Sequence, residues 1–294
     1  MEILYNVKVE RPVARTLRVR YIDYKEWMLH VLTWLLLFFT FLPLIEMLFK
    51  SFKTPEQNIH NPWLLSFPLN FDNYKIAWQY VSVYIVNTLI ITIIAVALIL
   101  IIATLSAFIF ARFDFPGKEF LFMSILALMM VPGILTLIPL FKVVDNLKIL
   151  NSYWAVILPG IRSQLPFGIF VLRTFMAAIP EDLFDAARID GATTFQTFRK
   201  IAIPLSMPMI STLAILSLLF FWNDIIWPSI ALTSQDLYTI AIGLQPFTST
   251  TAQVTRNFGP AMAGYVITSI PLLVAFFFAS KQFIEGMTSG ALKL

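Results

Sequence analysis

Long apolar runs of about twenty residues alternate with short polar segments along most of the chain. A run of that length allows an α-helix, rising 1.5 Å per residue, to cross a hydrocarbon core of about 30 Å. The apolar residues follow one another without the strict alternation of a membrane barrel, so the pattern favours helices. Six spans are expected, at residues 29–49, 84–111, 120–141, 153–178, 205–230 and 260–281.

The distribution of Lys and Arg predicts the orientation of these spans, because basic residues gather on the cytoplasmic side. With the N-terminus inside, fourteen of the 21 basic residues lie on the inner side. The sequence therefore predicts an all-α membrane protein with six transmembrane helices, N-in and C-in. Its parts are a cytoplasmic arm (1–28), a permease domain (29–281) and a cytoplasmic tail (282–294). A five-span chain, with 153–178 only partly inserted, is the alternative.

Small and helix-breaking residues refine this picture. Small residues at 103, 104, 106, 107 and 111 are spaced for close packing between helices. Pro132-Gly133, Pro139, Pro159-Gly160 and Pro166 lie inside the third and fourth spans, where they indicate broken helices of the kind that line transport paths. Ordinary membrane helices carry such residues too. Arg162 is expected near the outer end of the fourth span, with its charge reaching the surface.

Composition excludes several kinds of chemistry. The chain is 59% hydrophobic and 13% charged, against about 25% charged in a soluble domain. Cysteine is absent and there are only two histidines, so no disulfide framework, thiolate catalysis or metal cluster is expected. A membrane enzyme is disfavoured for the same reason. An ion-coupled secondary transporter is disfavoured because acidic residues are nearly absent from the middle of the spans. The net charge of +4 is no signature of nucleic-acid binding.

The most polar stretch after the N-terminal arm is residues 180–205, PEDLFDAARIDGATTFQTFRKIAIPL. Pro180 followed by two acidic residues suits the start of a helix, and Gly191 suits its end. Thr194 is expected to cap a second short helix that Pro204 closes. The stretch predicts a helix–turn–helix outside the membrane that presents small Ala residues to another surface. The alternative is a polar loop that only joins two spans.

This stretch resembles the cytoplasmic loop of ATP-binding-cassette (ABC) importer permeases. The family pattern is Glu-Ala-Ala, then Asp-Gly, then Ile-x-Leu-Pro about ten residues later. The chain has Asp185-Ala186-Ala187, Asp190-Gly191-Ala192 and Ile201-Ala202-Ile203-Pro204, with Asp and Ile at two positions where the family has Glu and Leu. Further stretches resemble the carbohydrate subfamily: SFKTPE (51–56), ATLSAFIFARFDFPGK (103–118), MMVPGILTLIPLF (129–141), FWNDIIWP (221–228) and FIEGMTSGALK (283–293).

The resemblance implies the smaller, six-span permease of a maltose-type importer in a prokaryotic inner membrane. Its implied partners are a second homologous permease, two copies of a cytoplasmic ABC ATPase and an external solute-binding protein. The chain has no GxxxxGKS or GxxxxGKT phosphate loop, so ATP and Mg²⁺ are expected on the ATPase and no cofactor on this chain. A di- or oligosaccharide is the expected substrate; a polyol derivative such as glycerol phosphate is the alternative.

Three groups of site residues are expected, and the resemblance implies two of them. Residues expected to couple to the ATPase are Glu181, Asp185, Ala186, Ala187, Asp190, Gly191, Ala192 and Pro204. A second contact with the ATPase is expected at Gly286, Gly290 and Lys293. From the residues themselves, an acid and an amide beside Trp222 suggest a path for sugar hydroxyls at Trp222, Asn223 and Asp224. The alternative for this last group is an interfacial helix end within an aromatic belt.

Overall fold

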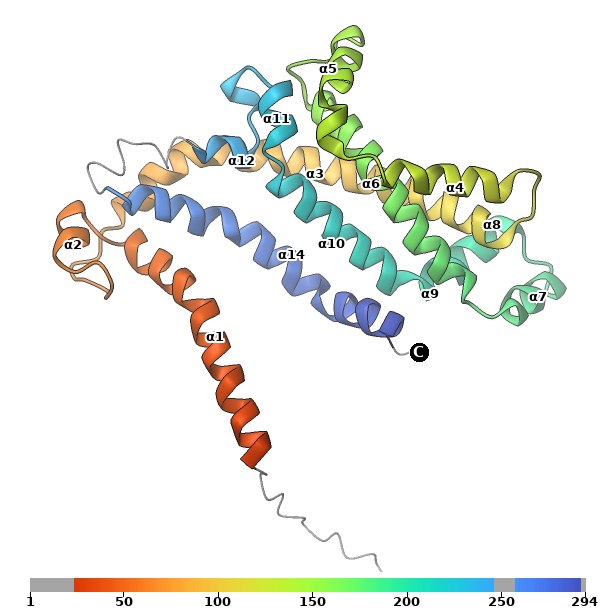
Figure 1. The fold of residues 1–294 in the computed structure, drawn as a ribbon, viewed down its shortest axis with the longest axis horizontal. Coiled ribbons are helices and arrows are strands. Elements are labelled where there is room, and N and C mark those ends of the chain that lie inside the picture. Colours follow the sequence, from red (N-terminus) through yellow and green to blue (C-terminus); the bar gives the residue numbers. More distant parts are fainter. Residues whose placement is uncertain (1–23, 246–256, 292–294) are drawn as a thin grey trace, which may run out of the picture. The chain divides into compact units, whose positions relative to one another are not determined.

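The computed structural model describes residues 24–245 and 257–291, and all regular structure within those ranges is helical (Figure 1). It divides into two units, Met1–Ile45 and Glu46–Leu294, which are considered separately. The described part of the first unit belongs to α1 (Tyr24–Ser51). The hydroxyls of Thr33 and Thr40 donate to carbonyls four residues earlier, so both are satisfied within the helix, as a lipid environment requires.

Four described helices are long and apolar enough to cross a membrane: α1, α3 (Asp72–Arg112), α6 (Tyr153–Ala177) and α14 (Gly259–Ala291). Two further pairs of helices pass the same test, but each is bent, and counting them gives up to six spans. The predicted all-α fold with membrane-spanning helices is therefore confirmed. The number of six and the N-in, C-in orientation stay predictions.

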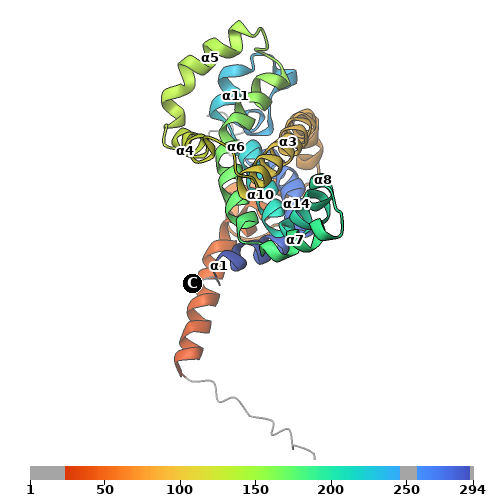
Figure 2. The ribbon, with the colours of Figure 1, turned by 90° about the vertical axis from the view of Figure 1, so that its right-hand side faces the viewer.

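The core of the second unit lies where α3 packs against α6, with α10 (Met207–Asn223) and α14 beside them (Figures 1 and 2). Ala103 and Ala107 of α3 are fully buried. A Cβ placed on Gly168 of α6 would lie 3.2 Å from the Cβ of Ala103, so the two backbones meet at small residues. This is the close packing that the small residues of 103–111 predict.

The predicted third span is not one straight helix. It consists of α4 (Lys118–Met129), η1 (Gly133–Thr136) and α5 (Leu137–Asn146). The run Gly133–Asn146 is bent by 94° from α4. Pro132, in extended conformation, precedes η1 and cannot continue the hydrogen-bond ladder of α4. The break expected at Pro132-Gly133 is present within the predicted span 120–141.

The fourth span is continuous despite its prolines, which corrects the break expected at Pro159-Gly160 and Pro166. Proline lacks an N–H, so Pro159 leaves the carbonyl of Ala155 without its usual helical donor. The indole Nε1 of Trp227, on α11 (Ile226–Ala231), donates to this oxygen at 2.7 Å. A neighbouring helix therefore replaces the missing bond, which is how membrane helices tolerate proline.

The predicted fifth span, 205–230, starts close to α10 but contains a break before its predicted end. The α10 helix ends at Asn223, and Asp224 and Ile225 separate it from α11. At its start, α10 is bent by 73° from the helical run Thr194–Leu205. That run contains α8 (Thr194–Thr197), the π-helix η2 (Phe198–Ala202) and α9 (Ile203–Leu205).

The segment between the first two predicted spans is partly helical, because α3 begins at Asp72 rather than near residue 84. The short helix α2 (Pro55–His60) precedes it. Lys53 is buried and donates to the carbonyl of Asn61 at 2.6 Å, and burial lowers the pKa of this ammonium. Asn73 donates to the carbonyls of Ser51 and Lys53, both at 2.9 Å, and so ties α3 to the end of α1.

Two shorter elements follow α11, namely η3 (Gln235–Leu237) and α12 (Ile240–Gly243). Asn87 of α3 donates to the carbonyls of Asp236 and Tyr238, at 2.7 and 3.0 Å, and so holds this segment against α3. The predicted tail is also helical as far as Ala291, in continuity with α14.

Candidate functional site

The polar stretch forms a helix, α7 (Glu181–Ile189), that packs through one residue. Phe184 is its only buried member. The apolar side chains of Leu183 and Ile189 are 45% and 86% exposed. The helix begins after Pro180, which takes the cap position rather than the first helical position expected for it.

Gly191 ends α7 as predicted. Its φ is +77°, in the left-handed region that glycine adopts without strain. The N–H of Ala192 then donates to the carbonyl of Ala187 at 2.9 Å, which satisfies a free carbonyl at the helix end. A Cβ on Gly191 would meet no atom within 4 Å, so backbone conformation alone selects this glycine.

The second helix is capped one residue earlier than predicted. The hydroxyl of Thr193 accepts the N–H of Gln196, and the Gln196 side chain accepts the N–H of Thr193. This reciprocal pair is a capping box, so Thr193 and not Thr194 is the cap. Pro204 does not close the helix either, since it lies in the first turn of α9.

Arg112, the last residue of α3, fastens α7 to the bundle. Its guanidinium donates to the carbonyls of Met176 and Ile179, both at 2.6 Å, at the end of α6. It also forms a 2.5 Å ion pair with Glu181, and it lies 4.0 Å from the centre of the Phe184 ring. The Arg112 side chain is only 7% exposed, so one buried cation joins α3, α6 and α7.

A second arginine makes a similar contact at the same end of α6 without reaching α7. Arg173 forms a 2.7 Å ion pair with Glu119 of α4 and lies 3.7 Å from the centre of the Phe122 ring. It therefore joins α6 to α4.

Four of the eight predicted coupling residues line a hollow beside α7 and α8. Asp185 and Ala186 are exposed on α7, where Asp185 pairs with Arg188 at 3.0 Å. Residues lining the hollow, about 430 Å³ in volume, are Ala187, Asp190, Gly191, Ala192, Gln196, Thr197, Lys200 and Ile201. The structure thus places half of the predicted set around this hollow, whereas Glu181, Asp185, Ala186 and Pro204 lie outside its lining.

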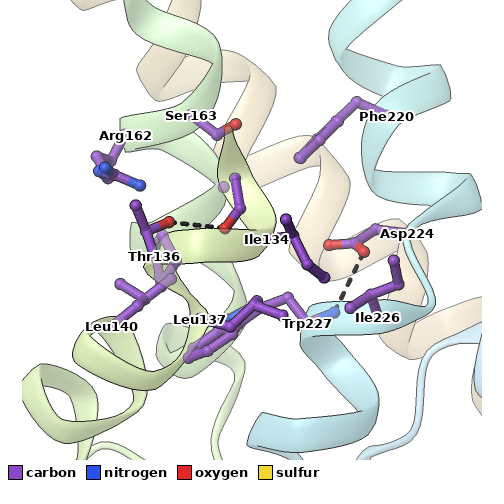
Figure 3. A pocket seen from close by; sticks show the side chains of 13 residues that line it. Ile134, Thr136, Leu137, Leu140, Arg162, Ser163, Phe220, Asp224, Ile226 and Trp227 are labelled. Carbon is purple, nitrogen blue, oxygen red and sulfur yellow. Dashed lines mark hydrogen bonds between the residues drawn. The ribbon is translucent and has the colours of Figure 1, made fainter. Parts of the chain in front are cut away.

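A pocket of about 250 Å³ lies where two helix breaks meet α6 (Figure 3). One wall is η1, at the bend of the third span, and another is the turn between α10 and α11. Arg162 and Ser163 of α6 contribute the third wall, and Asp224 lies across from Arg162. Asp224 accepts a hydrogen bond from the backbone N–H of Trp227.

The three residues predicted for the substrate path do not line one site. Asp224 faces the pocket with Arg162, whereas Trp222 and Asn223 line a second pocket, of about 330 Å³, with residues of α12 and α14. Trp222 is largely buried, and Asn223 donates to the carbonyl of Leu219 within its own helix. Successive residues at a helix end point in different directions, which the sequence alone does not show.

Comparison with known protein families identifies the family that has this architecture. Residues 99–288 match the model of the family described as the binding-protein-dependent transport system inner membrane component. The chain belongs to this family. The matched part includes α7, α8 and the pocket, and it leaves out α1.

Relatives in this family are sugar ABC transporter permeases. The chain is 33% identical over 276 residues to the arabinooligosaccharides transport system permease protein AraQ of Halalkalibacterium halodurans, covering 90% of this chain and 97% of AraQ. It is 31% identical over 265 residues to the trehalose transport system permease protein SugB of Mycobacterium tuberculosis, covering 90% and 96%.

A solved structure shares the fold. A chain of a bacterial ABC transporter that imports the acidic polysaccharide alginate superposes with a TM-score of 0.78 at 20% identity. The match covers 90% of this chain and 98% of that one. At that identity the likeness concerns the fold alone.

The sequence did not predict the contacts that three residues of this inner membrane component make in the structure. Arg112 was counted only as an inner charge, Phe184 was not singled out, and Arg162 was expected at the surface. Phe184 is the one aromatic residue of α7, and this size is the signal that could have identified it as the buried residue. The predicted second contact is not placed, because Lys293 lies outside the described residues and only the helical backbone is described at Gly286 and Gly290.

Proposed function

We propose that this chain is one permease of an ATP-driven importer that takes up a di- or oligosaccharide delivered by an external solute-binding protein. A second homologous permease forms the path together with it, and two copies of a cytoplasmic ATPase carry ATP and Mg²⁺. Family membership supports this proposal, as do the sugars printed in the names of the relatives. For the alginate transporter, a structure in complex with a periplasmic protein carrying an alginate pentasaccharide supports the external partner.

The helix α7 is the coupling helix of this proposal, and its exposed apolar face is the observation that carries it. Leu183 and Ile189, at intervals of three residues with the exposed Ala186 between them, form an apolar stripe on α7 that suits contact with a protein partner. The small side chains of Ala186 and Ala187 allow that partner to approach closely. Ion pairs of α7 with Arg112 then transmit its displacement to α3 and α6.

Site-specific photocrosslinking tests this role. With p-benzoylphenylalanine at Ile189, the assembled importer should yield a crosslink between this chain and the ATPase. A matched control places the same group at Leu64, which is also exposed, in the segment between α2 and α3. No ATPase crosslink from position 189, or one of equal yield from position 64, contradicts the coupling role.

A further inference from the structure

The pocket between η1, α6 and the turn after α10 is an unusual place for charge. Arg162 is the tenth residue of the 25-residue helix α6, about 14 Å from its start at 1.5 Å per residue. Ionisable groups at such a depth in a membrane protein face a cavity or a partner and mark functional sites. Arg162 has no hydrogen bond or ion pair with any residue within 24–245 and 257–291.

Asp224 provides the opposite charge without neutralising Arg162. The two side chains lie at opposite edges of the pocket, with Ile134 of η1 between them in Figure 3. Asp224 accepts the N–H of Trp227 at 3.4 Å, and a second backbone donor comes from Ile226. A carboxylate has about four lone-pair sites, so accepting capacity is left for a ligand.

The rest of the lining is apolar or carries hydroxyls. Trp227 and Phe220 contribute aromatic side chains, and Ser163 contributes a hydroxyl. Non-helical backbone at the two breaks is tolerated at membrane depth only where it is buried in protein or lines a water-filled cavity. A site with an apolar middle, a donor at one edge and an acceptor at the other matches a sugar ring, which has apolar faces and hydroxyls around its rim.

We propose that this pocket is a substrate subsite on this chain, in which Arg162 donates to and Asp224 accepts from the hydroxyls of one ring of a neutral saccharide. Its volume of about 250 Å³ is below the roughly 300–1,000 Å³ of pockets that enclose whole ligands, so it holds one end of an oligosaccharide. One cation and one carboxylate leave the pocket without net charge. An acidic ring that spans both edges would gain attraction at Arg162 but meet repulsion at Asp224, whereas a neutral ring can hydrogen-bond at both edges, so the pocket favours neutral rings. This proposal rests on the proposed function.

The absence of cysteine makes a direct test available. Ser163→Cys introduces a single thiol into the pocket, and its reaction with a water-soluble methanethiosulfonate requires hydrated thiolate. The matched control is Ser269→Cys, in the pocket that contains Trp222. Labelling of this chain is measured in the assembled importer, with and without arabinotriose, trehalose or melibiose, and with an alginate trisaccharide as the acidic probe.

The expected result is that at least one neutral saccharide slows labelling at position 163, whereas none slows it at 269 and the alginate trisaccharide slows neither. In the Ser163→Cys background, Arg162→Gln and Asp224→Asn should each raise the saccharide concentration for half-protection by about tenfold, through loss of a charged hydrogen bond. The subsite proposal is overturned if the saccharide protects Ser269→Cys instead of Ser163→Cys. It is also overturned if the saccharide concentration for half-protection is unchanged in both Arg162→Gln and Asp224→Asn.

Two further measurements distinguish a failure of the subsite proposal from a failure of the proposed function. If the wild-type importer takes up none of the saccharides, the proposed function itself fails. If it takes them up while Ser163→Cys remains unlabelled or unprotected, only the subsite fails. Co-purification of the second permease with Arg162→Gln completes the test, because loss of assembly would show that Arg162 pairs with the partner chain and not with substrate.

Discussion

At the scale of single residues, Arg112 is the contact that most directly tests the proposed coupling. Its guanidinium satisfies two carbonyls at the end of α6 and holds Glu181 of α7. Arg112→Gln removes the charge and most of these donors, so we expect solute transported per ATP hydrolysed to fall by about tenfold, while membrane insertion persists. The measurement is uptake and ATP hydrolysis in the same proteoliposomes.

Arg173 provides the matched control for this prediction. It has the same pairing of a carboxylate and an aromatic ring, but its partners, Glu119 and Phe122, lie on α4. Arg173→Gln should therefore leave transport per ATP nearly unchanged. Arg112→Lys should recover only part of the loss, because an ammonium cannot reproduce the planar fork of donors. Equal effects in Arg112→Gln and Arg173→Gln would show general destabilisation rather than a coupling contact.

Residue roles of this kind were only partly accessible from the sequence. Gly191 was predicted from local rules, since a glycine after an amphipathic turn suits a left-handed helix end. Arg112 and Glu181 are 69 positions apart, and nothing in the local sequence pairs them. The pocket that Arg162 lines was not predicted, because it depends on how η1 folds back against α6, a tertiary arrangement that composition does not specify.

At the scale of elements, the continuity of α6 depends on Trp227. Its indole satisfies the Ala155 carbonyl that Pro159 leaves free. Trp227→Phe leaves this buried oxygen without a donor, and we expect a loss of about 1–3 kcal/mol in the free energy of unfolding. Thermal unfolding of the detergent-solubilised importer, followed by the loss of soluble complex, reports this as a lower midpoint.

Two variants separate the lost hydrogen bond from lost packing. Trp222→Phe is the matched control, because Trp222 is equally buried, at 6% exposure, and no indole hydrogen bond is present in the described structure. Pro159→Ala in the Trp227→Phe background restores a backbone N–H four residues after Ala155, so the double variant should regain most of the stability. If Pro159→Ala gives no recovery, the orphaned carbonyl is not the cause.

Elements divide in a similar way into those that the sequence predicts and those that it does not. Hydropathy located the long helices, since a membrane helix must be apolar along its whole length. It did not distinguish Pro132, where the chain bends by 94°, from Pro159, where the helix continues. The difference is the donor from Trp227, which is 68 residues away in the sequence. The start of α3 was also missed, because polar residues of 72–83 extend an apolar helix beyond the membrane.

At the scale of the whole permease, several basic residues that form ion pairs lie at one end of the α3–α6 pair. Arg112, Arg173 and Arg188 all pair with carboxylates there, close to α7. Lys53 and Lys75 lie at the opposite end of α3, where Asn73 joins it to α1. The end that carries α7 is thus the more basic one, in agreement with a cytoplasmic position.

Single-cysteine labelling in intact cells tests this orientation, and the natural chain contributes no background thiol. Phe195 on α8 and Trp63 before α3 are matched in exposure, at 65% and 67%. We expect an impermeant maleimide to label Trp63→Cys in intact spheroplasts, and to label Phe195→Cys only after the membrane is permeabilised. Met28→Cys, near the start of α1, should behave like Phe195→Cys if the N-terminus is inside. Labelling of Phe195→Cys from outside would place α7 beyond the reach of any cytoplasmic ATPase, and coupling through this helix would then be physically excluded.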